Sequence, residues 1–263
     1  MGWRNDLDLN LKNKKVLITG GSRGIGLATA KIFLEEGATV TIVGRSETNL
    51  AKARTQLEAI SHNVSTVSAD LSFDKQREAL YASRDDFDIV VNNAGAIPSG
   101  GIHDLSMDEW RKAWDLKVFG YIHLCKLFSA AMMARKSGVI VNIIGIGGRH
   151  TTPSYICGAG GNAALIAFTQ ALGAETAKNG VRTYGINPSA TATDRTIELL
   201  KQRAKRETGN EENWKNFINT ETLPFGRLQN PEEIANMAVM LCSDKVQYLS
   251  GTVIDSTGGF QWS

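Results

Sequence analysis

Short, continuous apolar runs alternate along the chain with longer segments in which apolar residues recur every three or four positions. Runs of this kind, rich in β-branched residues, are typical of strands buried on both faces of a parallel sheet. The longer segments, such as 25–36 and 108–135, have the periodicity of helices. The expected strands are Val16–Thr19, Val40–Val43, Val64–Ser68, Ile89–Asn92, Val139–Ile144, Val181–Ile186 and Thr252–Asp255.

This alternation predicts a doubly wound α/β fold, with about seven parallel strands joined by right-handed crossovers and helices on both faces. No repeat or low-complexity linker divides the 263 residues, so we expect one Rossmann-like domain. A charged helical insertion at about 192–223, with Trp214 and Phe217 as aromatic anchors, interrupts the alternation of strands and helices. A solvated surface excursion and a lid over a substrate pocket explain it equally well.

Charge and composition exclude several classes of partner. The net charge of +2 is too balanced to favour nucleic acid or an anionic membrane surface. The polar first fifteen residues and the lack of an apolar run of bilayer length predict a cytoplasmic protein that spans no membrane. Three widely spaced cysteines indicate free thiols, and four scattered histidines predict no metal site.

A glycine-rich loop, Thr19-Gly20-Gly21-Ser22-Arg23-Gly24-Ile25-Gly26, follows the first expected strand and opens a helix. Glycines there permit a tight turn and let a pyrophosphate approach the backbone. The free N–H groups and the dipole at the helix N-terminus favour an anion at the same place. The strand–loop–helix context therefore predicts a dinucleotide site.

This loop, together with Asn92-Asn93-Ala94-Gly95 at the end of the fourth expected strand, resembles the signatures of the short-chain dehydrogenase/reductase family. The resemblance continues through 188–193 and 226–259 and covers nearly the whole chain. It implies a nicotinamide cofactor, with Thr193 at the nicotinamide amide and Asp70-Leu71 at the adenine. The implied cofactor contacts are Gly20, Ser22, Arg23, Gly24, Ile25, Asp70, Leu71, Asn93, Ala94, Gly95, Pro188 and Thr193.

The choice of cofactor is expected at the end of the second strand. A carboxylate there would bind the ribose hydroxyls of NAD and repel a 2′-phosphate. This chain has Gly44 at that position, followed by Arg45 and Ser46. Because Arg45 is placed to pair with a 2′-phosphate and Arg23 adds a second guanidinium, we expect NADP(H) to be preferred over NAD(H).

The family's acid–base residues are expected to be missing. Its members use an asparagine, a serine, a tyrosine and a lysine that lowers the pKa of the tyrosine. Aligning Asn162-Ala163-Ala164-Leu165 with the family's K-A-A-L places Lys117, Gly145, Gly158 and Asn162 at these four positions. The two glycines have no functional group, and their missing side chains predict extra volume beside the nicotinamide.

A second alignment places Tyr155 at the tyrosine but puts Ala159 at the lysine and Asn142, inside a strand, at the serine. In the first alignment Tyr155 lies just before the vacant position, and Lys117 comes from the neighbouring helix. A relocated Tyr155–Lys117 acid–base pair is our hypothesis, since catalysis depends on geometry rather than chain order. Packing roles for both residues, and His150 as the acid, remain alternatives.

Three functions are consistent with these residues. The first is an atypical NADP(H)-dependent oxidoreductase that acts on a small-molecule carbonyl or alcohol. The second is a non-redox enzyme that uses the nucleotide structurally, and the third is a catalytically silent NADP(H)-binding protein, a sensor or the partner of an active homologue. The resemblance further implies a homodimer or homotetramer formed through the long helices at about 106–134 and 158–178.

Overall fold

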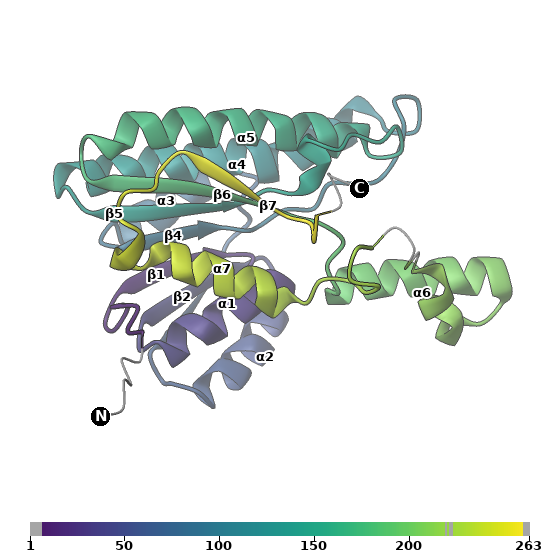
Figure 1. The fold of residues 1–263 in the computed structure, drawn as a ribbon, viewed down its shortest axis with the longest axis horizontal. Coiled ribbons are helices and arrows are strands. Elements are labelled where there is room, and N and C mark those ends of the chain that lie inside the picture. The colour runs from purple at the N-terminus through teal and green to yellow at the C-terminus, as the bar shows by residue number, and fades with distance from the viewer. Residues whose placement is uncertain (1–6, 219, 221–222, 260–263) are drawn as a thin grey trace.

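The structure, a computed structural model, describes residues 7–218, 220 and 223–259, the side chains of 202 and 203 excepted. One sheet of seven parallel strands, in the order β3-β2-β1-β4-β5-β6-β7, runs through the molecule (Figure 1). The strands are β1 (Lys15–Thr19), β2 (Thr39–Gly44), β3 (Val64–Ser68), β4 (Ile89–Asn92), β5 (Gly138–Ile143), β6 (Val181–Pro188) and β7 (Thr252–Ser256). The predicted single-domain, doubly wound fold is confirmed, and each expected strand is present.

Helices cover both faces of the sheet. On one face α1 packs between α2 and α7, and on the other α4 packs between α3 and α5 (Figure 1). A separate apolar core fills each interface, because the central strands bury side chains on both of their faces. The helices are α1 (Gly24–Glu35), α2 (Glu47–Glu58), α3 (Asp74–Ser83), α4 (Met107–Ala134), α5 (Ile156–Ala177), α6 (Asp194–Thr208) and α7 (Pro231–Cys242).

The order of the strands reverses at β1, which pairs with β2 on one side and with β4 on the other. Loops that leave the carboxyl ends of β1 and β4 therefore diverge toward opposite faces and open a crevice between them. The glycine-rich loop follows β1, and Asn93–Gly95 follow β4. The topology thus brings the two predicted cofactor segments to the same edge of the sheet.

Helices α4 and α5 are long and apolar enough, by length and composition, to cross a membrane. The expectation that no apolar run of that length is present was therefore wrong. Half of the apolar window in each helix is buried inside the fold. Packing against the sheet and against each other accounts for their apolar residues.

The expected insertion forms α6 and the 3-10 helix η2 (Glu211–Phe217), which pack on each other and project from the sheet (Figure 1). Its two ends meet at one point, where Thr191 pairs with Gln229 in a parallel bridge. Backbone hydrogen bonds close this junction from Ala192 N to Gln229 O (2.7 Å) and from Gln229 N to Ala190 O (2.9 Å). Residues 219, 221 and 222 of the predicted insertion lie outside the described residues.

Candidate functional site

A cleft of about 250 Å³ lies at the carboxyl ends of β1, β2 and β4. It brings together all the predicted cofactor residues except Asp70 and Pro188. Those that line it are Gly20, Ser22, Arg23, Gly24, Ile25, Arg45, Ser46, Leu71, Asn93, Ala94, Gly95 and Thr193. Asp70 reaches the cleft through Arg45, whereas Pro188 ends β6 and pairs there with Ser256 on β7.

Two polar side chains hold the glycine-rich loop against the segment after β4. The Thr19 hydroxyl accepts hydrogen bonds from the backbone N–H groups of Asn93 (2.9 Å) and Ala94 (3.0 Å). The Asn93 amide donates to the carbonyls of Thr19 and Gly20, both at 3.1 Å. These bonds satisfy backbone groups that the strand ends leave without partners.

The glycines of the loop are required by close backbone approach. Gly20 has φ +65°, and a Cβ there would lie 3.0 Å from Ala94 Cα. At Gly26 a Cβ would lie 2.4 Å from the Gly20 carbonyl oxygen. The loop is thus a cradle with bare backbone on its inner side, which is the form that a pyrophosphate group needs.

The end of β2 carries the predicted selectivity residues. The Arg45 side chain is 63% exposed, with its Nη1 3.9 Å from the Asp70 carboxylate, so it is available to a ligand. Gly44 leaves space beside the Ser22 hydroxyl, which would lie 3.5 Å from a Cβ at that position. The Ser46 hydroxyl accepts from Asn49 N at 3.3 Å and so begins α2 as its N-cap.

The side chain of Tyr155 occupies the space that a side chain at Gly158 would need. A Cβ built on Gly158 would lie 2.0 Å from Cζ and 2.6 Å from Oη of Tyr155. The loop that carries Tyr155 is held in place by Gly100, whose N–H donates to Ser154 O at 2.7 Å. The expectation of extra volume at Gly158 was therefore wrong, because an aromatic ring from the preceding turn fills it.

The backbone at Gly145 has a conformation that other residues rarely adopt, with φ +133°. Its N–H donates to Asn187 Oδ1 at 3.3 Å. Asn187 in turn donates to Asp255 (2.7 Å), and Arg149 pairs with the same carboxylate oxygen (3.0 Å). This chain of contacts ties the turn after β5 to the ends of β6 and β7.

Asn162, at the predicted lysine position, is 2% exposed. Its Nδ2 would lie 3.0 Å from a Cβ at Gly145, so it fills part of the space that a serine would occupy. Its Oδ1 has no hydrogen-bond partner among the described residues. A buried acceptor in this condition is unfavourable unless a ligand or water supplies a donor.

Asn142, the serine position in the second alignment, lies inside β5 and is fully buried. It accepts from Asn92 (2.9 Å) and donates to Thr169 (3.0 Å). Its amide therefore links β4, β5 and α5 within the core rather than facing the cleft. These contacts assign Asn142 a structural role.

Lys117 extends from α4 past Gly95, where a Cβ would lie 2.9 Å from its Cδ. Its Nζ donates to the carbonyl of Ile144 at 2.5 Å and lies 6.0 Å from the centre of the Tyr121 ring. Burial lowers the pKa of Lys117 to about 8, and the positive charge of Arg195 acts in the same direction. Lys117 is thus a buried cation whose pKa is close to neutral pH.

Arg195, at the start of α6, was missed by the sequence reasoning. It lines the cleft, and its Nη2 donates to the Ile97 carbonyl at 3.1 Å. Burial raises the pKa of Tyr155, and the cation that opposes this rise is Arg195. One sequence signal was available, because a cation in the first turn of a helix opposes the helix dipole.

His150, the alternative acid, follows the 3-10 turn η1 (Ile146–Gly148), and its backbone N–H donates to Ile146 O at 2.9 Å. It belongs to the same loop as Tyr155. His150 is not among the described residues that line the cleft.

A family model described as short chain dehydrogenase matches residues 14–204. This chain belongs to the short-chain dehydrogenase family. Its relatives include the 3-oxoacyl-[acyl-carrier-protein] reductase of Chlamydia trachomatis, which is 33% identical over 95% of this chain and 98% of the relative. The 3alpha-hydroxysteroid dehydrogenase of Mediterraneibacter gnavus is 29% identical over 94% of this chain and 97% of that protein.

Solved structures agree with the family fold over almost the full length. The L-sorbose reductase of Gluconobacter frateurii, complexed with NADPH and L-sorbose, has a TM-score of 0.91 at 30% identity and covers 98% of this chain and 100% of its own. A variant of actinorhodin polyketide ketoreductase with NADPH has a TM-score of 0.88 at 25% identity, covering 95% and 98% of the two chains. This short-chain dehydrogenase therefore has the fold of enzymes crystallised with a dinucleotide.

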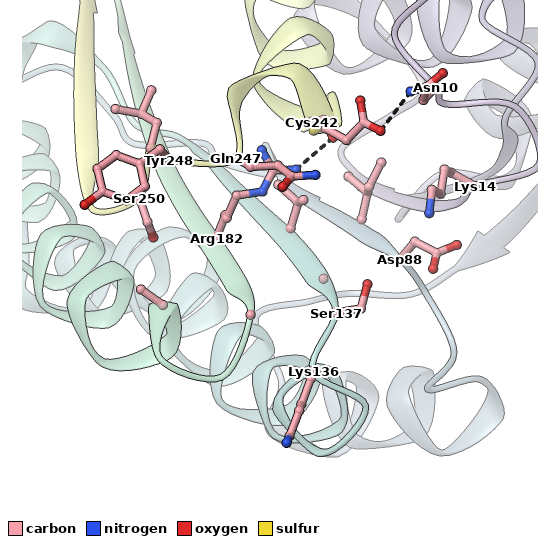
Figure 2. A pocket seen from close by; sticks show the side chains of 17 residues that line it. Asn10, Lys14, Asp88, Lys136, Ser137, Arg182, Cys242, Gln247, Tyr248 and Ser250 are labelled. Carbon is pink, nitrogen blue, oxygen red and sulfur yellow. Dashed lines mark hydrogen bonds between the residues drawn. The ribbon is translucent and has the colours of Figure 1, made fainter.

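A wider cleft of about 850 Å³ lies at the opposite edge of the sheet, where β4, β5 and β6 begin (Figure 2). Its arginine, Arg182, donates to backbone carbonyls at the end of α7, including those of Cys242 (3.1 Å) and Ser243 (2.9 Å). Asn10 donates to Asp244 at 2.8 Å on its far wall (Figure 2). In this short-chain dehydrogenase these polar groups satisfy one another and stabilise the end of α7.

Proposed function

We propose that this chain is an NADP(H)-dependent oxidoreductase that interconverts a carbonyl and an alcohol on a small molecule. The observation that carries the proposal is the cleft at the carboxyl ends of β1, β2 and β4, whose lining includes the bare glycine cradle, Arg45, Asn93–Gly95 and Thr193. In this assignment the cradle holds the pyrophosphate and Thr193 the nicotinamide amide. Membership of the family and the NADPH carried by two structural neighbours support it.

The preference for NADP(H) is assigned to Arg45. Its exposed guanidinium at the end of β2 is free to leave Asp70, 3.9 Å away, for a 2′-phosphate, which offers a stronger, doubly charged partner. Gly44 places no carboxylate at the position where one would repel that phosphate. Asp70 would then remain beside the adenine.

Tyr155 and Lys117 are proposed as the groups that handle the proton. Bound NADPH supplies a hydride to a carbonyl carbon, so the protein must supply a proton to the carbonyl oxygen. Lys117 has a pKa of about 8, so its ammonium is largely protonated at neutral pH. This pKa is also close enough to neutral pH for the group to exchange its proton. The raised pKa of Tyr155 keeps its phenol protonated, so both groups are donors in the direction of reduction.

The test measures cofactor binding and turnover separately. We expect NADPH to bind, and generic ketones and aldehydes to turn over poorly, since the loss of positioned acid–base groups costs about 10²–10⁴ in rate. With the best substrate found, Lys117→Met and Tyr155→Phe should each suppress turnover and leave NADPH affinity nearly unchanged. The double variant should lose little more than either single variant, because groups that act as a unit are non-additive.

Lys112→Met on α4 and Tyr248→Phe are matched controls, because both side chains are exposed and neither lines the cleft at the carboxyl ends of β1, β2 and β4. Each control should keep the parent rate. The Tyr155–Lys117 hypothesis would be refuted if the losses of turnover in Lys117→Met and Tyr155→Phe add independently in the double variant. Equal losses of turnover in the two controls would also refute it. Failure to bind NADPH would refute the proposed function as a whole.

A silent cofactor-binding protein is the second candidate function. The remodelled turn favours it, because Gly145 and Gly158 bear no side chain and the Tyr155 ring fills the space at Gly158. This candidate forecasts tight NADPH binding, no turnover with any substrate, and no effect of the two substitutions beyond stability. If the chain is instead a non-redox enzyme, we expect turnover to persist whether the bound cofactor is oxidised or reduced.

The proposal also covers the oligomeric state of the chain and the role of α6 and η2. We infer a cytoplasmic homodimer or homotetramer formed through α4 and α5, whose outer surface exposes Phe119, Ala163, Ala164 and Ala167. Sedimentation velocity measures this oligomeric state directly.

We also propose that α6 and η2 form the predicted lid, because the first residues of α6, Asp194 and Arg195, already line the cleft.

A further inference from the structure

Arg195 occupies a position that is electrostatically unfavourable in the protein alone. It is the second residue of α6, where the free backbone N–H groups and the helix dipole make the surroundings positive. Its guanidinium does not turn away from the body of the protein: it lines the cleft and donates one hydrogen bond to the Ile97 carbonyl. Within the described part of the chain no second hydrogen bond engages the planar fork, so its other donors are available beside the cleft.

A second cation, Lys117, lies behind the part of the cleft that Gly95 lines. The Lys117 chain passes over Gly95, which lines the cleft together with Arg195 and Ala96. Its ammonium has the Ile144 carbonyl as hydrogen-bond acceptor. Burial lowers the pKa of Lys117, and the positive charge of Arg195 adds to this lowering.

Neither cation has a carboxylate partner among the residues that the structure describes. Asp194 also lines the cleft, but it is exposed and pairs with neither of them within the described part of the chain. Lys117 is buried without the paired anion that ordinarily accompanies a buried charge, whereas Arg195 is exposed where it lines the cleft. An anionic ligand at Arg195 would offset the unfavourable charge at the start of α6 and would also bring a negative charge toward Lys117.

We propose that the substrate of this chain carries a carboxylate, bound by Arg195 at the mouth of the cleft with Lys117 on its inner side. The rigid fork of a guanidinium fits the two oxygens of a carboxylate, and the compact ammonium adds a second charge. The phosphates of a dinucleotide have their own cradle at the glycine-rich loop. The location of this site next to the reacting carbon rests on the proposed oxidoreductase function.

Binding of paired probes to the full chain saturated with NADP⁺ tests the proposal without turnover. Pyruvate, acetoacetate and levulinate are titrated calorimetrically, each against its methyl ester, which keeps the carbonyl and removes the charge. The parent should bind at least one acid more tightly than its ester. Arg195→Gln should weaken that acid about 10- to 100-fold, as expected for a hydrogen bond between charged groups, and leave the ester unchanged. Arg195→Lys should recover part of the loss.

Arg206→Gln is the matched control, because Arg206 is exposed in the last turn of the same helix. It should change neither affinity. The proposal is overturned if the parent binds no acid more tightly than its ester, or if Arg195→Gln lowers the affinity for acid and ester equally. It is also overturned if Arg195→Gln lowers the affinity for NADP⁺ instead, which would assign Arg195 to a cofactor phosphate. Absence of NADP⁺ binding would refute the proposed function alone, and the acid–ester comparison on the protein without cofactor would then decide the carboxylate site by itself.

Discussion

Adding one methyl group at Gly158 tests the central geometric finding, that the ring of Tyr155 fills this position. The new Cβ would lie 2.0 Å from Tyr155 Cζ, whereas two carbon atoms pack at about 3.5–4.0 Å. The ring must therefore move by roughly 1.5 Å or leave its place. Overpacking of this kind costs about 1–3 kcal/mol.

Helix propensity acts in the other direction, since alanine is more favourable than glycine by about 1 kcal/mol inside a helix. We therefore expect Gly158→Ala to range from neutral to destabilising by about 2 kcal/mol in the parent. With Tyr155→Ala already present, the same change should stabilise by about 1 kcal/mol. The difference, a coupling of about 1–3 kcal/mol, isolates the contact between the two positions.

Urea unfolding of the four proteins at one protein concentration measures this coupling, and NADPH titration shows whether each remains folded around the cleft. Gly160→Ala is the control, because a Cβ there would meet Trp114 at an ordinary 3.5 Å. It should stabilise by about 1 kcal/mol whatever residue stands at 155. If Gly158→Ala behaves like Gly160→Ala in the parent, the ring does not occupy the position and the reasoning is refuted.

Two further predictions concern charge. Arg45→Ala should weaken NADP(H) much more than NAD(H), by about 1.5–3 kcal/mol, and Gly44→Asp should reverse the preference; equal effects on both cofactors in fluorescence titrations would remove the assignment. Lys117 has a folded pKa of about 8 against an ordinary 10.5, so between these pH values its amine binds more protons in the unfolded chain, and the contribution of Lys117 to the stability of the parent should rise with pH. That rise, at most about 3 kcal/mol, should be absent in Lys117→Met and present in Lys112→Met; a pH-independent difference between parent and Lys117→Met in urea unfolding would contradict it.

The sequence predicted the strands, the sheet and a set of residues most of which line one cleft, because each depends on local patterns. Continuous apolar runs such as Val16–Ile18 indicate buried strands, and the glycines after them indicate close backbone approach. The order of strands around β1 then follows from the handedness of crossovers. These rules act within one strand–loop–helix unit, and the structure keeps them.

The catalytic side could not be predicted in the same way, because its arrangement depends on contacts between distant segments. Alignment shows that Gly158 lacks a side chain, but not that Tyr155 from the preceding turn fills the space. Nor does it show that Gly145 has φ +133°, a conformation in which a serine would be strained. At the positions predicted for the family's serine and tyrosine, side chains would therefore require removal of the Tyr155 ring and a change of the turn.

The junction between Thr191 and Gln229 makes the segment between them, which carries α6 and η2 and is here called the arm, replaceable as a unit. Because the chain leaves and re-enters the sheet at a single bridged point, the length and sequence of the segment between can change at a small entropic cost and without disturbing β6 or β7. Most residues that line the cleft lie outside the arm, and only its base, Thr193–Arg195, contributes to the lining. An exchange of the arm beyond Arg195 would therefore change the surface beside the cleft and leave the residues that line it in place.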